Sequence, residues 1–484
     1  MVGITSYGAY VPKRRLSRMA IIQSMGWFAP GLMTAARGER SMCNWDEDSM
    51  TMAVAAARDC LEGMDKSTVN AAYLASTSLP FRDRQNSGIL AAALNLPEEG
   101  LVTADFTASL KSGTTALLTA VDAVQGEGKD KVLVTATDAR DTKVAWFFEM
   151  WYGDGAASLL LGKDNVIAEF KGAHSVSCDF VPRYRGADAK FDYGWEERWI
   201  REEGFTKIIP AAIGGLLEKC KLSMDDVSKI VYPCHLSKRV HQSIAKPLKA
   251  APEKIQDNLA DVVGDTGAAH PMMMFVSALE EANPGDKIVV ASFGQGCDAL
   301  LFEVTDNIKK LPGRNGMKGS LANRKEETQY ARFQKFRDLV NVEMGIRAES
   351  NKQTALSALW RHRKHVLGLV GGECTKCGTP QIPKMRMCVN PSCNAVDSQV
   401  EHEFANKEGI IKSYTGDMLA VSVDPPAIYG LVQFEGGGRS LYDFTDCELA
   451  DVKVGQPVKM SFRIKYYDNV RDFNGYYWKA VPQT

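Results

Sequence analysis

Apolar residues in the first 310 positions alternate between two spacings. Helical stretches such as TTALLTAVDAVQ (114–125) and PMMMFVSALEEA (271–282) each precede a short run rich in β-branched residues, within GKDKVLVTATDA (128–139) and PGDKIVVASFGQ (284–295). Helices that alternate with short apolar strands indicate α/β units whose parallel strands are buried. The pattern therefore predicts an α/β fold for this part of the chain.

This pattern occurs twice. Besides the segments above, STVNAAYLASTS (67–78) matches DDVSKIVYPCHL (225–236), and the copies lie 156 to 158 positions apart. We interpret the repeat as two similar halves, residues 1–165 and 166–310, that pack as layered α/β structures with a site between them. The alternative is chance similarity between α/β segments.

The repeat also predicts which loops meet. It aligns the turn at 107–113 with Gly264-Asp265-Thr266-Gly267, and the loop at 76–78 with Cys234-His235-Leu236. Strand-to-helix turns of the two halves should lie near a common twofold axis. We therefore expect Leu110, His235 and Asp265 to converge, although they are far apart in sequence.

The chain changes character at residue 311. In NRKEETQYARFQKFRDLVNVEMGIRAES (323–350), apolar residues recur at helical spacing and the other positions are charged. We predict an amphipathic helix inside a connector that spans 311–370. The apolar positions are Tyr330, Phe333, Phe336, Leu339 and Val340.

Four cysteines follow in CTKCGTPQIPKMRMCVNPSC. Cys374, Cys377, Cys388 and Cys393 form two short knuckles, which is a spacing that places four thiolates tetrahedrally around Zn²⁺. A full set of four protein ligands favours a closed, structural zinc site over a catalytic one. A redox disulfide and an iron site are the alternatives. We assign residues 371–400 to a zinc ribbon.

Residues 401–484 contain short β-strand patterns separated by Gly, Asp and Pro clusters. Such a pattern indicates a small β-barrel, here an OB-fold. OB-folds also bind nucleic acid, and aromatic residues of this segment such as Tyr466 and Trp478 could stack on bases. Its acidic residues and the lack of a basic stripe argue against nucleic acid as the partner.

The composition of the chain limits the classes of protein to which it can belong. The chain has 484 residues, 24% charged residues and a net charge of −1, so no global field attracts nucleic acid or a membrane surface. No apolar stretch is long enough to span a bilayer. The 11 cysteines do not form a secreted disulfide pattern. We expect a cytoplasmic protein of several domains.

Four segments in the first 310 residues resemble the thiolase superfamily, in particular its hydroxymethylglutaryl-CoA synthase and ketoacyl-ACP synthase III branch. They are NWDEDSMTMAVAAARDCLEGM (44–64), GDGAASLLLG (153–162), YPCHLSK (232–238) and SFGQGCDALLFEV (292–304). The resemblance implies a duplicated, layered α-β-α-β-α fold. The zinc ribbon and barrel together resemble the Zn-ribbon OB-fold domain that accompanies thiolase-like acyl-CoA enzymes, where it is usually a separate subunit.

Transferred residue by residue, the family's site is only partly present. Its His falls on His235, its Asn on Asp265 and its nucleophilic Cys on Leu110, and the neighbouring hydroxyl is Ser109. A thiolate carries the acyl group in this family, and leucine has no such group. The resemblance thus implies C–C bond formation or cleavage next to a thioester, by an aldol-type route without an acyl-enzyme.

The resemblance further implies a coenzyme A thioester as substrate. Lys238, Arg239 and Lys111 are the candidate cations for its phosphates. Thiolase-like halves usually dimerise, so we expect a homodimer or a larger assembly. The alternative is a non-catalytic scaffold that presents acyl-CoA to a second thiolase-like subunit that carries the cysteine.

Overall fold

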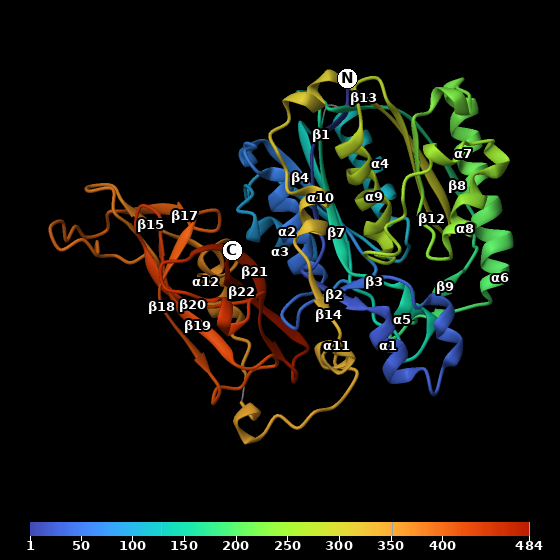
Figure 1. The fold of residues 1–484 in the computed structure, drawn as a ribbon. Helices are drawn as coiled ribbons and strands as arrows, with labels where there is room; N and C mark the ends of the chain where they lie inside the picture. Colours follow the sequence, from blue (N-terminus) through green and yellow to red (C-terminus); the bar gives the residue numbers. More distant parts are fainter. Residues whose placement is uncertain (127, 351, 484) are drawn as a thin grey trace. The chain divides into compact units, whose positions relative to one another are not determined.

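The computed structural model describes residues 1–126, 128–350 and 352–483. The chain forms two compact units. The first comprises residues 1–43, 48–91 and 96–339, and the second comprises 44–47, 92–95 and 340–484. Each unit is described below by itself (Figure 1).

A nine-stranded sheet forms the framework of the first unit. Its order is β11-β12-β13-β8-β1-β7-β6-β4-β5. The strands are β1 (Gly3–Tyr10), β4 (Val69–Ala75), β5 (Val102–Phe106), β6 (Lys131–Asp138), β7 (Gly155–Gly162), β8 (Ala168–Ser177), β11 (Lys229–Val231), β12 (Lys287–Gly294) and β13 (Gly296–Val304).

The two halves of this sheet join at a narrow seam. Only Gly3 and Ile4 of β1 pair with Glu169 and Ala168 of β8. A Cβ on Gly3 would lie 2.1 Å from the Ala168 carbonyl oxygen, so the close approach of the strands requires glycine there. Because the seam is so short, each half can turn away from the other and pack as its own layer.

The strand order confirms the repeat that the sequence predicts. Outward from the seam, one half runs β1-β7-β6-β4 and the other runs β8-β13-β12-β11. β6 is antiparallel to β7 and parallel to β4, and β12 is antiparallel to β13 and parallel to β11. The matched segments 67–78 and 225–236 therefore contribute strands in equivalent places.

Helices complete five layers (Figure 1). α4 (Ser112–Gln125) and α9 (His270–Glu281) pack against each other and against strands of both halves, so they form the middle layer. α2 (Ser49–Leu61) covers the other face of β1, β6 and β7, and α7 (Thr206–Cys220) covers β8, β12 and β13. This is the layered α-β-α-β-α fold expected from the sequence.

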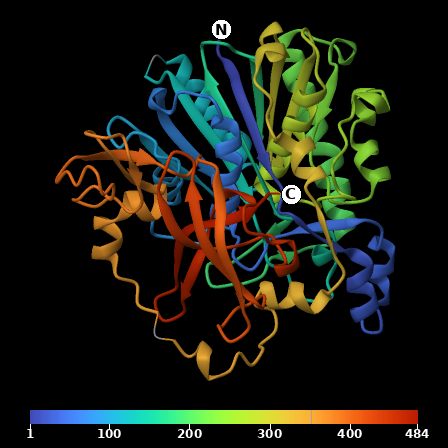
Figure 2. The ribbon, with the colours of Figure 1, turned by 60° about the vertical axis from the view of Figure 1, so that its left-hand side comes forward.

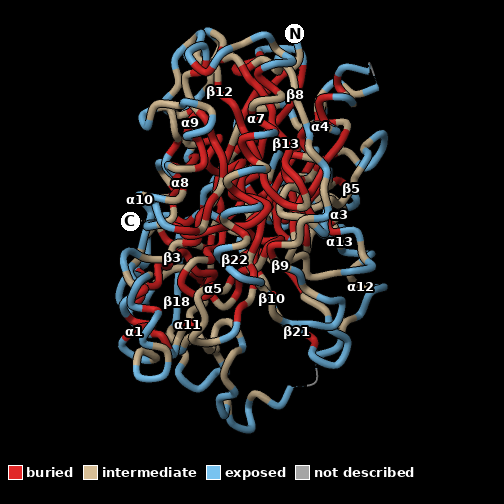
Figure 3. Tube along the Cα trace, turned by 90° about the vertical axis from the view of Figure 1, so that its right-hand side faces the viewer, coloured by how far each residue is buried: buried red, intermediate tan, exposed pale blue. Residues whose placement is uncertain are grey.

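The middle layer holds the main core (Figure 3). Met272, Met273, Met274 and Phe275 of α9 are all fully buried, because this helix is surrounded by sheet on both sides. A helix that is apolar all round belongs in such a position. Shape complementarity in this core therefore sets where the N-termini of α4 and α9 lie.

The prediction of a single amphipathic helix within 323–350 is wrong. Only Tyr330–Phe336 form a helix there (α11), preceded by α10 (Gly316–Ala322) and the short strand β14 (Lys325–Glu327). Asp338 and Gly345 have φ values of 49° and 73°, which end right-handed helix. Tyr330 and Phe333 are buried, as the apolar spacing indicated. Two more short helices follow, α12 (Leu356–Arg361) and α13 (Arg363–Gly368).

The second unit consists of two small sheets (Figure 2). Three short strands, β15 (Val370–Cys374), β16 (Pro380–Gln381) and β17 (Gln399–Glu403), flank the cysteine cluster. Five antiparallel strands form the barrel in the order β20-β19-β18-β21-β22. They are β18 (Gly409–Asp417), β19 (Ala427–Phe434), β20 (Arg439–Asp443), β21 (Pro457–Asp468) and β22 (Phe473–Pro482).

A bridge between Phe444 and Ala480 connects the end of β20 to β22 and closes the barrel. Its interior includes Trp478, whose indole N–H donates to the Leu367 carbonyl at 2.7 Å. These features agree with the predicted OB-fold. Among the described residues, no helix is long and apolar enough to cross a membrane.

Candidate functional site

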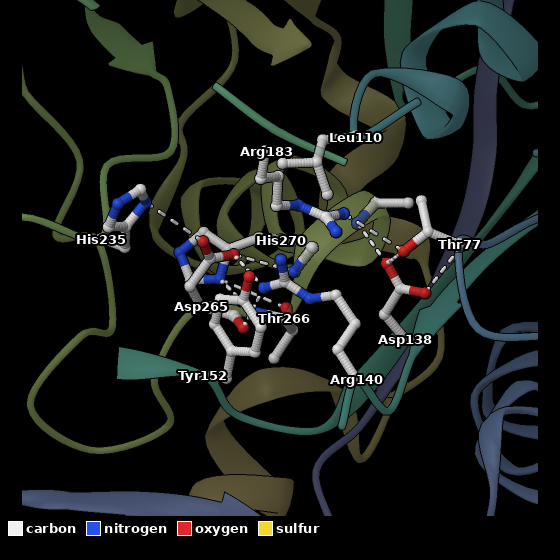
Figure 4. Close-up of polar contacts among 12 residues, drawn as sticks. Thr77, Leu110, Asp138, Arg140, Tyr152, Arg183, His235, Asp265, Thr266 and His270 are labelled. Carbon is white, nitrogen blue, oxygen red and sulfur yellow. Dashed lines mark hydrogen bonds and ion pairs between the residues drawn. The ribbon is translucent and has the colours of Figure 1, made fainter. Parts of the chain in front are cut away.

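One pocket in the first unit brings loops of both halves together (Figure 4). Its polar lining is Arg140, Arg183, His235 and Asp265. The rest of the lining is mainly apolar: Leu110, Phe148, Tyr152, Pro182, Ile200, Phe205, Pro233, Cys234, Gly267 and Phe293. An apolar pocket with a few convergent polar groups has the composition of a small-molecule site.

The predicted convergence of Leu110, His235 and Asp265 is observed. Leu110 lies in the turn before α4, His235 in the loop after β11, and Asp265 in the loop before α9. The turn before α4 is tight: Ala108 has a φ of 68°, and the Ser112 N–H donates to the Ser109 carbonyl at 3.1 Å. This turn therefore presents a branched apolar side chain to the pocket.

Asp265 is the centre of the polar group. Its Oδ2 lies 3.6 Å from Nδ1 of His235, and its Oδ1 lies 3.1 Å from Nη2 of Arg140. Burial alone would raise the pKa of the Asp265 carboxyl, but Arg140 and His235 hold this pKa well below its usual range. Asp265 is therefore a carboxylate at neutral pH, positioned to orient the imidazole.

Arg140 is a site residue that the sequence reasoning missed. It follows β6, its side chain is 0% exposed, and its guanidinium carbon lies 3.6 Å from the ring centroid of Tyr152. Burial would lower the pKa of Arg140, but Asp265 raises it, so the group stays charged. One signal was available: β6 and β12 are equivalent strands, and loops after equivalent strands meet.

Asp138, at the end of β6, holds the adjoining loop in place. It accepts hydrogen bonds from the hydroxyls of Ser76, Thr77 and Ser78 at 2.8 to 3.0 Å. The backbone N–H of Ala268 also donates to it at 2.8 Å. The carboxylate thus ties loops of the two halves together beside the pocket.

The other predicted residues lie outside the pocket lining. Ser109 Oγ contacts the backbone N–H of Lys111 at 3.4 Å, and Lys111 Nζ pairs with the buried Asp298 at 3.1 Å. Lys238 and Arg239 are exposed in the first turn of α8 (Lys238–Ile244). These two side chains are accessible to a phosphate group from solvent, whereas Lys111 already has a carboxylate partner.

Cys234 is the one thiol among the described residues that line the pocket. Its residue is 3% exposed, and burial raises the pKa of the thiol to about 12. A thiol with this pKa is protonated at neutral pH and is a poor nucleophile. Cys234 is therefore unsuited to act as a nucleophile.

The four cysteines of the second unit form a compact cluster. Their sulfur atoms all lie within 4.8 Å of one another, with Sγ–Sγ distances of 3.9 Å for Cys374–Cys393 and 3.6 Å for Cys377–Cys388. Four thiolates at the Zn–S distance of about 2.3 Å have sulfur atoms roughly 3.8 Å apart in a tetrahedron. The cluster fits one tetrahedral metal ion.

Two known protein families match parts of the chain, one in each unit. Residues 217–303 match the family described as 3-oxoacyl-[acyl-carrier-protein (ACP)] synthase III C terminal. Residues 402–463 match the family described as ChsH2, C-terminal OB-fold domain.

Relatives in sequence extend the match to most of the chain. The hydroxymethylglutaryl-CoA synthase of Caldivirga maquilingensis is 28% identical over 353 residues, which are 70% of this chain and 99% of the relative. That of Methanopyrus kandleri is 29% identical over 320 residues, 64% of this chain and 89% of the relative.

Solved structures agree on the fold. A hydroxymethylglutaryl-CoA synthase complexed with CoA has a TM-score of 0.61 at 17% identity, covering 73% of this chain and 94% of its own. The 3-oxoacyl-(acyl carrier protein) synthase III of Pseudomonas aeruginosa has a TM-score of 0.56 at 19% identity, covering 63% and 98%.

Layers and strand order define a thiolase-like fold. Within that class, the chain is similar to hydroxymethylglutaryl-CoA synthases over most of its length and to ketoacyl-ACP synthases III at residues 217–303, and its C-terminal part contains an OB-fold domain.

Proposed function

We propose that this protein forms or cleaves a C–C bond next to a CoA thioester by an aldol-type reaction, without an acyl-enzyme. The observation that carries the proposal is the pairing of a leucine at the nucleophile's turn with an intact His235–Asp265 pair in the same pocket. A ping-pong reaction requires a nucleophile, whereas an aldol reaction requires only an acid–base group and a means to stabilise an enolate.

His235 is the acid–base group in this reaction. In the cleavage direction it accepts the proton of the substrate's β-hydroxyl, the Cα–Cβ bond breaks, and its electron pair moves onto the thioester as an enolate. The aldehyde or ketone product leaves, and His235 returns the proton to Cα. Asp265 contacts Nδ1 of the imidazole, which leaves Nε2 for the substrate.

Coenzyme A is the proposed carrier, because the structural relative named above was solved with CoA. Lys238 and Arg239 on the surface of α8 are the proposed contacts for its phosphates. We propose Zn²⁺ as the metal of the four-cysteine cluster, where it stabilises the fold of the ribbon. We also retain the proposal of a cytoplasmic homodimer or larger assembly.

Incubation with 3-hydroxyacyl-CoA thioesters tests the function. We expect release of acetyl-CoA or another shorter acyl-CoA together with an aldehyde or ketone, and no added acyl mass on the intact protein. An acyl adduct on Ser109, Cys234 or any other residue would overturn the non-covalent route. Because the reaction is reversible, an acyl-CoA mixed with aldehydes provides the assay in the condensing direction.

A second function is favoured by the same leucine. If the site does not turn over any acyl-CoA, the protein is a scaffold that presents acyl-CoA to a second thiolase-like chain with the cysteine. Purification from the native host distinguishes the two functions. A stoichiometric second chain, and activity only in its presence, would support the scaffold.

A further inference from the structure

The guanidinium of Arg140 has hydrogen-bond donors that the protein does not use. Nη2 donates to the backbone carbonyl of Asp265 at 2.8 Å and lies 3.1 Å from Asp265 Oδ1. Nε and Nη1 are buried and have no hydrogen-bond partner among the described residues. A buried donor without a hydrogen-bond partner is destabilising, so these two N–H groups indicate a place for a ligand.

The charges around the pocket indicate what kind of ligand this is. Arg140 is paired with Asp265, and Arg183 is paired with Asp192, whose other oxygen lies 3.9 Å from Arg185. Asp138 is a third aspartate near the pocket, and it accepts hydrogen bonds from neighbouring hydroxyls. The charges of these three arginines and three aspartates balance one another. The site needs no further permanent anion, but it offers N–H groups to an oxygen.

Gly267 packs closely against Arg140. A Cβ at this position would lie 3.0 Å from Nε of Arg140 and 2.2 Å from Oδ2 of Asp138. Gly267 also has a φ of 59° and lines the pocket. The missing side chain leaves room for Arg140 beside the pocket, and stacking on Tyr152 fixes the plane of the guanidinium.

Arg140 and His235 approach the same carboxylate from its two oxygens. Oδ1 of Asp265 contacts Arg140 and Oδ2 contacts His235 (Figure 4). A proton acceptor, His235, and the unpaired N–H groups of Arg140 therefore belong to two residues that contact the same Asp265. A β-hydroxy thioester has its hydroxyl and its carbonyl oxygen only a few bonds apart, so one substrate can reach both groups.

We propose that Arg140 is a further catalytic residue, which donates a hydrogen bond from one of its unpaired guanidinium N–H groups to the thioester oxygen and stabilises the enolate. This inference rests on the proposed aldol-type function. While His235 holds the proton taken from the β-hydroxyl, the electron pair of the broken C–C bond resides on the thioester oxygen. The transient anion and the imidazolium balance each other, and Arg140 remains protonated throughout.

Three substitutions test this role. Arg140→Met removes the donors, Arg140→Lys keeps the charge beside Asp265 but not the planar group, and Arg82→Met removes an exposed guanidinium that pairs with Asp188 and does not line the pocket. For each variant we would measure kcat and KM with 3-hydroxyacyl-CoA, the melting temperature, and deuterium incorporation into the methyl group of acetyl-CoA in D₂O.

We expect Arg140→Met to lower kcat and the deuterium exchange by about 10²–10³-fold, the effect of losing one donor to an oxyanion, with little change in KM. Added guanidinium ion should restore part of the activity. Arg140→Lys should be nearly as slow, and Arg82→Met should behave like the wild type. If Arg140→Met does not fold, the same expectations apply to Arg140→Lys.

The outcomes separate the two proposals. If the wild type turns over substrate and exchanges deuterium, and folded Arg140 variants do so at the same rate, the catalytic role of Arg140 is wrong. The proposed function would still stand in that case. A fall in melting temperature without guanidinium rescue would show that Arg140 only supports Asp265, which also overturns it. A wild type that neither turns over nor exchanges acetyl-CoA overturns both proposals.

Discussion

Oδ2 of Asp265 lies 3.6 Å from Nδ1 of His235, although the two residues come from separate loops of the second half of the repeat. Arg140, from the first half, contacts the other oxygen of the same carboxylate. The His235–Asp265 pair therefore lies where the two halves of the repeat meet, and Leu110 lines the same pocket.

The first prediction concerns His235. His235→Ala should lower kcat for an acyl-CoA substrate by about 10²–10⁴-fold, because a positioned general acid–base contributes that much. Steady-state kinetics would measure it. Cys234→Ala is the matched control from the adjacent position and should retain activity, since its thiol is protonated at neutral pH. Equal losses in both variants would contradict the assignment.

The second prediction concerns the metal. Purified protein should contain about one zinc per chain, and Cys377→Ser should unfold the ribbon, because binding of structural zinc contributes on the order of 10 kcal/mol to folding. Elemental analysis and thermal unfolding would measure both. Cys178→Ser, a cysteine outside the cluster, should keep the zinc. Protein without metal, or with iron, would contradict this prediction.

The third prediction concerns coenzyme A. Lys238→Ala should weaken CoA binding roughly tenfold, since a hydrogen bond to a charged group contributes about 1.5 kcal/mol. Calorimetry with CoA alone would measure the affinity. Lys309→Ala, an equally exposed lysine in another part of the unit, serves as the control. Unchanged affinity for Lys238→Ala would show that other residues hold the phosphates.

The fourth prediction concerns pH and the loop that carries His235. His241 is buried, its Nε2 lies 3.2 Å from the Tyr232 carbonyl oxygen, and burial lowers its pKa to about 4. In the unfolded chain the pKa of histidine is about 6.5. The unfolded state therefore binds more protons between these values, and the free energy of unfolding falls as pH drops from about 6.5 to 4.

His241→Gln should flatten this part of the pH profile, which urea unfolding at several pH values would measure. The buried His270 also has a lowered pKa, so part of the slope should remain in the variant. An unchanged profile in His241→Gln would mean that His241 contributes no stability in this range.

Much of the architecture could be predicted from local patterns. The matched segments 67–78 and 225–236 carry β4 and β11, and the four cysteines at 374–393 are sufficient to predict a metal cluster. These features can be predicted from the sequence because strand periodicity and ligand spacing are short-range properties. The repeat also placed Leu110, His235 and Asp265 together, since equivalent loops of paired halves must meet.

Local patterns did not reveal which groups the charged side chains pair with, nor where the predicted helix ends. Lys111 was a candidate for phosphate binding, but it pairs with Asp298, which lies far along the chain on β13. The apolar spacing of 323–350 favoured one long helix, but backbone angles at Asp338 and Gly345 end it. The pairing of Lys111 depends on a partner that is distant in sequence.

The sequence by itself determined that this protein is built from two α/β halves, a four-cysteine cluster and a small barrel, and that its nucleophile position holds leucine. The tertiary structure alone decided that Arg140 enters the pocket, contacts Asp265 and leaves Nε and Nη1 free. Strand and helix patterns reflect neighbouring residues, whereas the role of a buried charge is set by the few groups that surround it after folding.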